Sequence, residues 1–128
     1  MEYFISKKVE GSFTAVMEKT AALLRDEGFG IKTEIDVDGT FREKLGVEYK
    51  RYHILGACNP GVAYQAVQAE EMVGVFLPCN VILIEQEPGL VEVATISVAH
   101  MMGSIGNPKL NEVAGQIDAS LKSVIEKL

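Results

Sequence analysis

The 128-residue sequence predicts an α+β domain: a mostly antiparallel sheet of about five strands, two long helices and one shorter helix. Three observations lead to this prediction. Apolar residues recur at helical spacing in two long segments, alternating or wholly apolar runs indicate strands between them, and Asn-Pro or glycine marks the junctions. The elements follow in the order β-α-β-β-α-β-β-α with short connections, so we expect a single domain over residues 1–128.

Each predicted helix has a start signal. The first, over about 13–27, follows Ser12, a favoured N-cap residue, and stops at Gly28. The last, over 108–128, begins with an Asn-Pro dipeptide and has apolar residues along one face. The same dipeptide begins the shorter helix, over 60 to 71 or 72. These signals place helices at the start, middle and end of the chain.

The strands are predicted over residues 2–9, 31–37, 47–55, 79–85 and 91–98. The second alternates apolar and charged residues, which is typical of a strand with one wet face. The fourth has four consecutive apolar residues, so it should be central, and Glu-Pro-Gly-Leu joins it to the fifth as a hairpin. Asp38-Gly39 indicates a turn, and Thr40 with Glu43 has the form of a capping box, so we expect a turn or two of helix there.

Composition limits the functional classes. The net charge is −6, and the modest basic cluster of Arg42, Lys44, Lys50 and Arg51 is interleaved with glutamates, so nucleic-acid binding is not expected. No apolar stretch is long enough to span a membrane, and the N-terminus does not resemble a signal peptide. We therefore expect a soluble cytoplasmic protein without membrane partners, whose two cysteines are reduced.

The most distinctive segment is Ile-Leu-Gly-Ala-Cys-Asn-Pro at 54–60, followed by Leu-Pro-Cys-Asn at 77–80. Cys58 precedes a predicted helix N-terminus, where backbone N–H groups favour a thiolate, so it is a candidate nucleophile. Cys79 would be its resolving partner if the two strands pair, although no Cys-x-x-Cys motif is present. Asn59 and Asn80 are candidate ligand-binding residues beside them. The alternative is that Cys58 is a small apolar residue packed beneath the helix.

His100 with Met101 and Met102 follows the fifth predicted strand. Imidazole, thioether and thiolate groups form a soft ligand set, so Cys58, Cys79 and His100 are candidate ligands for copper(I), zinc or haem iron. Their spacing matches no metal motif, and a surface histidine beside core-filling methionines is the alternative. His53, within a predicted strand, is a weaker candidate. No particular cofactor follows from these residues.

The Ala-Cys-Asn-Pro segment, the alanine-rich helix after it and the Leu-Pro-Cys strand entry resemble the domain-of-unknown-function 302 family, over essentially the whole chain. The resemblance implies a β-α-β(4)-α architecture similar to TATA-binding-protein-like domains, with the helix at Pro60 as an insertion, and a homodimer. It implies no DNA binding, because a shared fold does not carry a function with it. It also implies no particular activity.

Three functions stay open. The preferred one is a homodimeric module that binds a small molecule or soft ligand between the sheet and the segment with Cys58, Asn59, Cys79 and Asn80. The second is a thiol-dependent redox or nucleophilic enzyme that uses Cys58. The third is a structural or interaction domain without a ligand.

Overall fold

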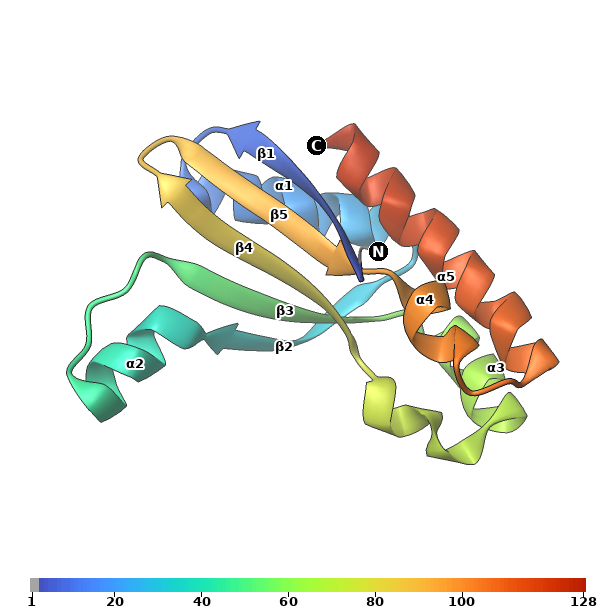
Figure 1. The fold of residues 1–128 in the computed structure, drawn as a ribbon. Helices are drawn as coiled ribbons and strands as arrows, with labels where there is room; N and C mark the ends of the chain where they lie inside the picture. Colours follow the sequence, from blue (N-terminus) through green and yellow to red (C-terminus); the bar gives the residue numbers. More distant parts are fainter. Residues whose placement is uncertain (1–2) are drawn as a thin grey trace.

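The central strand of the sheet is β4 (Cys79–Glu87), in a five-stranded antiparallel sheet with the order β1-β5-β4-β3-β2 (Figure 1). The structure is a computed structural model and describes residues 3–128. The other strands are β1 (Phe4–Glu10), β2 (Gly30–Asp36), β3 (Tyr52–Cys58) and β5 (Leu90–Ile96). The predicted fold class, the central fourth strand and the hairpin of the last two strands are confirmed.

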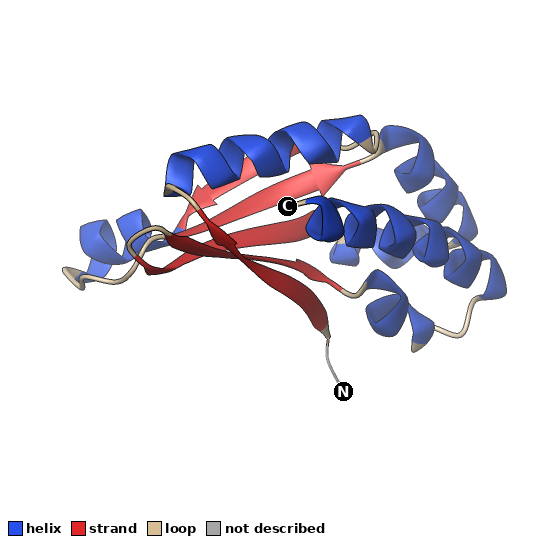
Figure 2. Cartoon of the chain, turned by 90° about the horizontal axis from the view of Figure 1, so that it is seen from above, coloured by secondary structure: helices blue, strands red, loops and turns tan. Residues whose placement is uncertain are grey.

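Two long helices, α1 (Phe13–Asp26) and α5 (Pro108–Lys127), pack on one face of the sheet. Their predicted caps are confirmed: the Ser12 hydroxyl accepts a hydrogen bond from the backbone N–H of Ala15, and the Asn107 side chain accepts two at the start of α5. Figure 2 shows α1 lying along one side of the strands. The strand residues that face these helices are buried in the core, and they include Val81, Leu83, Val91 and Val93.

The opposite face of the sheet carries the alternate residues, because successive side chains of a strand point to opposite sides. The strand register aligns Ile35, Ile54, Ile82 and Ala94 in one row across β2, β3, β4 and β5. We call the side of the sheet that carries this row, with Phe4 and Asn80 beside it, the open face. Ile35 is 49% exposed, and Phe4, Ile54 and Ile82 are half-buried. The open face is therefore more apolar than a wet face usually is.

The third strand was predicted too early, over 47–55, and lies at Tyr52–Cys58. Its pairing with β4 begins at Tyr52 and its pairing with β2 begins at His53, opposite Asp36. Residues 46–51 lie beyond the end of β2, where the chain has already turned into a helix, so they have no β2 partner and are exposed.

That helix, α2 (Val37–Leu45), is longer than the predicted turn or two and begins earlier. Asp36 is its N-cap, since its carboxylate accepts a hydrogen bond from the backbone N–H of Gly39 at 2.9 Å. Thr40 is not the cap; its hydroxyl donates to the backbone carbonyl of Asp36. The predicted turn at Asp38-Gly39 was therefore wrong. Figure 1 shows α2 at the end of β2, away from the core helices.

Several further boundaries differ from the prediction, and those of α1, β2, β4 and α5 shift by only one or two residues. The helix α3 (Pro60–Ala69) ends before Glu71 and is followed by the 3₁₀ helix η1 (Glu71–Phe76). The fifth strand ends at Ile96 instead of Val98, and the predicted loop after it contains α4 (Val98–Gly103), whose first N–H groups donate to the Asp118 carboxylate of α5. The first strand, predicted from residue 2, begins at Phe4; residue 2 itself lies outside the described residues.

Across residues 3–128, the helices are too short or too polar to cross a lipid bilayer.

Candidate functional site

The two cysteines lie on adjacent strands. Cys58 is the last residue of β3 and Cys79 is the first residue of β4, and the register places Cys79 opposite Ala57. Both thiols are free, with Cys79 buried and Cys58 partly exposed. Pairing of β3 with β4 therefore brings the two cysteines into the same corner of the sheet.

The space beside these cysteines is small. A cavity of about 10 Å³ lies between the strands and α3, lined by residues that include Phe29, Cys58, Val62 and Cys79. That volume is about what one water molecule needs. Burial, followed by the neighbouring Cys58, raises the pKa of the Cys79 thiol to about 11, so this thiol is protonated at neutral pH. The corner thus contains a buried neutral thiol and no room for an organic molecule.

The Asn59 side chain is engaged in local structure. Its Oδ1 accepts a hydrogen bond from the backbone N–H of Val62 at 3.4 Å, as expected for the N-cap of α3. Its Nδ2 lies over Gly28: a Cβ added at position 28 would come within 2.9 Å of this nitrogen. Gly28 also has a φ of 87°. Glycine is therefore required at position 28 both by the backbone and by the Asn59 amide. Asn59 fixes the junction between α1 and α3.

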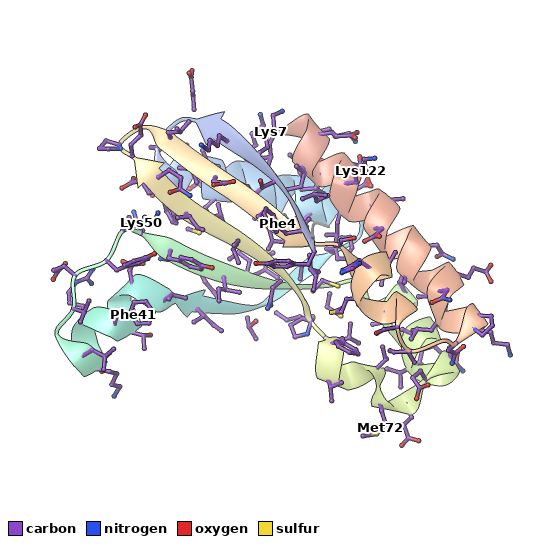
Figure 3. All side chains as sticks on the ribbon, viewed as in Figure 1. Phe4, Lys7, Phe41, Lys50, Met72 and Lys122 are labelled. Carbon is purple, nitrogen blue, oxygen red and sulfur yellow. The ribbon has the colours of Figure 1, made fainter. Side chains whose placement is uncertain are left out.

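Asn80 lies elsewhere, on the open face. Its backbone carbonyl accepts a hydrogen bond from Thr95 Oγ1 at 3.3 Å, while its side chain is exposed. A hollow of about 150 Å³ borders it, with a lining that is almost entirely apolar and includes Phe4, Ile82 and Ile96. Figure 3 labels Phe4 beside this part of the sheet. A second hollow of about 240 Å³ shares Asn80 and Ile96 and extends to the strand entry at Pro78.

His100 does not join the cysteines. It is exposed on α4, Met101 next to it is half-buried, and Met102 is fully buried in the core. Within residues 3–128, Cys58, Cys79 and His100 do not form a trio of mutually close ligand atoms. The core-filling alternative for Met102 is confirmed.

A different group does form such a trio. Ligand atoms of Asp36, Asp38 and His53 lie within 4.8 Å of one another, at the junction of β2, α2 and β3. The strand register explains the meeting, because His53 pairs with Asp36 and α2 begins immediately after it. His53 Nε2 is 3.4 Å from Asp36 Oδ1, and its Nδ1 is 3.5 Å from Glu34 Oε1. This is a histidine surrounded by three carboxylates.

Two members of this histidine–carboxylate cluster are buried. His53 is 8% exposed, its ring contacts Phe13 edge-to-face, and its Nδ1 has no hydrogen-bond partner among the described residues. Asp38 is 5% exposed; its Oδ1 accepts a hydrogen bond from the backbone N–H of Tyr52 at 2.8 Å, and its Oδ2 lies 3.4 Å from Arg42 Nη2. Burial alone would raise the pKa of Asp38, but the Tyr52 N–H and the other nearby donors outweigh it and lower the pKa.

From the sequence, His53 is only a weaker candidate within a predicted strand, and Asp38 is predicted in a turn. One signal was available: Asp36-x-Asp38 closes a predicted strand, and a histidine lies in the next one. The register of the two strands could not be deduced, because the third strand was expected to start five residues too early. Without that register, nothing placed His53 opposite Asp36.

The basic residues are dispersed. Arg42 pairs with Asp38 and Glu48, while Lys50 donates to the Gln86 side chain. The Arg51 guanidinium lies over the ring of Phe13, 4.2 Å from its centroid. Arg42 is thus paired with carboxylates, while Lys50 and Arg51 contact an uncharged amide and an aromatic ring.

One antiparallel sheet with its long helices on one side defines a two-layer α+β domain. Comparison with protein families then gives a match over residues 5–128 to the family described as "Domain of unknown function DUF302". The chain belongs to this family. A solved structure, "Crystal structure of uncharacterized conserved protein DUF302 from Bacillus stearothermophilus", is similar at 26% sequence identity and a TM-score of 0.91, covering 99% of this chain and 98% of the other. No curated protein matches the chain.

Proposed function

We propose that this protein is a cytoplasmic binding module for a small, mainly apolar molecule, held on the open face beside Asn80. The observation that carries the proposal is the apolar hollow over Phe4, Ile82 and Ile96. This hollow of about 150 Å³ adjoins the second hollow of about 240 Å³ at Asn80. Only the two together reach the range of about 300–1,000 Å³ that is typical of ligand pockets. Of the four predicted ligand-binding residues, only Asn80 borders this hollow. The cavity beside Cys58 and Cys79 has a volume of only about 10 Å³.

Asn80 determines the chemistry of the proposed ligand. An amide side chain offers both donors and an acceptor, and it is the exposed polar group that the two hollows share. Apolar walls with one or two placed polar groups are the usual pattern of small-molecule sites. The ligand would therefore have an apolar body and one hydrogen-bonding group.

A neutral fluorescent probe tests the proposal. N-phenyl-1-naphthylamine has two apolar ring systems and one N–H group, so it fits this chemistry. Titration should give saturable binding that is abolished by Ile82→Glu, which introduces a charge into the hollow. Asn80→Ala should weaken binding about 2- to 12-fold, the equivalent of one hydrogen bond of about 0.5–1.5 kcal/mol.

The matched control is Leu45→Glu, because Leu45 is an apolar residue of α2 that is 69% exposed and lines neither hollow. It should bind the probe like the wild type. Binding that is unsaturable, or that survives Ile82→Glu, would contradict the proposal.

We further propose that a second copy of the chain covers the open face, including the mouth of the hollow. The row formed by Ile35, Ile54, Ile82 and Ala94 is a contiguous apolar patch on a sheet that has no helix over it within residues 3–128. Such patches on soluble domains usually indicate an interface. A two-fold partner would close the hollow and keep the apolar row from water.

Sedimentation velocity measures this directly, because the monomer mass is 13.9 kDa. We expect a dimer for the wild type and for Leu45→Glu, and a monomer for Ile35→Glu, whose side chain is exposed enough to be replaced without disturbing the fold. A wild-type monomer at every concentration, or a dimer that survives Ile35→Glu, would refute the second copy while leaving the probe result to stand by itself.

A further inference from the structure

We propose that Asp36, Asp38 and His53 form a site for a divalent first-row transition-metal ion, with Zn²⁺ as the best fit. The site is independent of the open-face pocket and lies at the other end of β3. Three observations support it: the identity of the ligands, their spacing, and a buried imidazole nitrogen, His53 Nδ1, that has no hydrogen-bond partner among residues 3–128.

The buried histidine is the observation that points beyond a group of surface acids. Buried polar groups are nearly always hydrogen-bonded, and each exception requires an explanation. His53 is 8% exposed, yet its Nδ1 has no partner among the described residues and faces Glu34 Oε1 at 3.5 Å. Its other nitrogen faces Asp36 at 3.4 Å. A small rotation of this ring toward a bound cation would give one nitrogen a ligand bond and the other a carboxylate partner.

The spacing suits a small dication. Zinc binds imidazole nitrogen and carboxylate oxygen at about 2.0–2.2 Å, so two ligand atoms in a tetrahedral site are about 3.4 Å apart. His53 Nε2 and Asp36 Oδ1 are already separated by 3.4 Å, and all three ligand atoms lie within 4.8 Å of one another. The Asp36 side chain is 59% exposed, which leaves an entry path from solvent and an open coordination position for water.

The surroundings support a cation as well. Three carboxylates, those of Glu34, Asp36 and Asp38, surround one imidazole. Glu34 is placed to accept the N–H of the metal-bound imidazole, the arrangement that orients most histidine ligands. The mixed set of one nitrogen and two oxygen donors favours zinc and its neighbours in the first row over Mg²⁺ or Ca²⁺, which prefer oxygen ligands alone.

Arg42 is the internal competitor. Its guanidinium lies 3.4 Å from Asp38 Oδ2 and also pairs with Glu48, and its side chain is 51% exposed. It can therefore swing out when a metal ion arrives. Arg42→Gln removes this competing cation, so it should increase the affinity for the metal ion. If Asp38 is not a metal ligand, the substitution should leave the affinity unchanged.

The test uses the untagged full-length chain and Co²⁺ as a spectroscopic probe for Zn²⁺. We expect a visible d–d absorption band that saturates at one equivalent and is displaced by Zn²⁺. His53→Gln should weaken binding by at least about 10-fold, since even groups that only orient a ligand contribute 10- to 100-fold. Arg42→Gln should strengthen it.

Two matched controls separate this site from the alternatives. The chain has two histidines, so His100→Gln on α4 removes the other imidazole, and Cys58→Ser removes the more accessible thiol. Both variants should bind Co²⁺ like the wild type. Asp36→Asn replaces the exposed ligand while retaining a good N-cap residue, so it reports on the site even if His53→Gln fails to fold. The proposal is overturned if Co²⁺ does not bind, if binding survives Asp36→Asn, or if it is lost in Cys58→Ser.

Discussion

Asp38 holds the start of α2 against β3, so removing its side chain should lower the free energy of unfolding more than a typical surface substitution does. Its Oδ1 accepts the backbone N–H of Tyr52 at 2.8 Å, where β3 begins, and the carboxylate is 5% exposed. Asp38→Ala leaves that N–H without a partner, which costs about 1–3 kcal/mol. For a domain of this size, each 1 kcal/mol lowers Tm by roughly 4 °C, so we expect a fall of about 4–12 °C.

The assay is thermal and urea denaturation followed by circular dichroism, with EDTA present so that metal binding does not contribute. Asp38→Asn retains an oxygen acceptor for Tyr52 and should lose less than Asp38→Ala. Glu43→Ala, which removes an exposed ion pair on the same helix, should change stability by less than about 0.5 kcal/mol. A loss for Asp38→Ala no larger than for Glu43→Ala would refute the role that we assign to the Tyr52 contact.

The same carboxylate predicts a pH dependence. The pKa of Asp38 is lowered in the folded protein, because the Tyr52 N–H and neighbouring donors outweigh the effect of burial. Its contribution is therefore fully present above the unfolded pKa of about 3.9 and is lost as the pH falls from there through the folded pKa. The stability difference between wild type and Asp38→Asn should shrink in that acid range and stay constant near neutral pH.

Three further perturbations follow from the packing. Gly56→Ala should destabilise the fold by about 1–3 kcal/mol, because the new Cβ would collide with Thr33 Oγ1 and lie 2.8 Å from Pro78; Thr33→Ala in the same chain should recover part of the loss in urea denaturation. Leu83→Ala, at a fully buried position of the central strand, should lower the free energy of unfolding by about 2–5 kcal/mol in urea denaturation. A smaller decrease would mean that neighbouring side chains move in to fill the cavity. Cys79, with its pKa raised to about 11 by burial, should resist iodoacetamide at pH 8 until the protein is unfolded, and mass spectrometry would detect early labelling that contradicts this.

The fold was predictable because its main elements have local signals. Ser12 and Asn107 cap the two long helices as expected, and the apolar run of β4 identified the central strand. The start of β3 was missed because residues 47–51 alternate like a strand but have no partner on β2. Asp36 and Thr40 are both good N-caps, and local sequence could not tell which one begins α2.

The candidate sites were less predictable, since they depend on register and on which face a residue occupies. The sequence placed Asn80 with the cysteines because they are neighbours along the chain, but alternation along β4 puts Asn80 on the open face and Cys79 in the core. The histidine–carboxylate cluster combines residues from two strands and a helix start, and His53 meets Asp36 only through the pairing of β2 with β3. No property of the isolated segments encodes that meeting.

The central claim, that the ligand lies on the open face, is tested most directly by amide chemical shifts of ¹⁵N-labelled protein during titration with N-phenyl-1-naphthylamine. The account predicts that the largest shifts fall on Phe4, Asn80, Ile82 and Ala94, around the apolar hollow. Shifts concentrated at Cys58 and the start of α3 would contradict it, and would place the ligand in the cysteine corner instead.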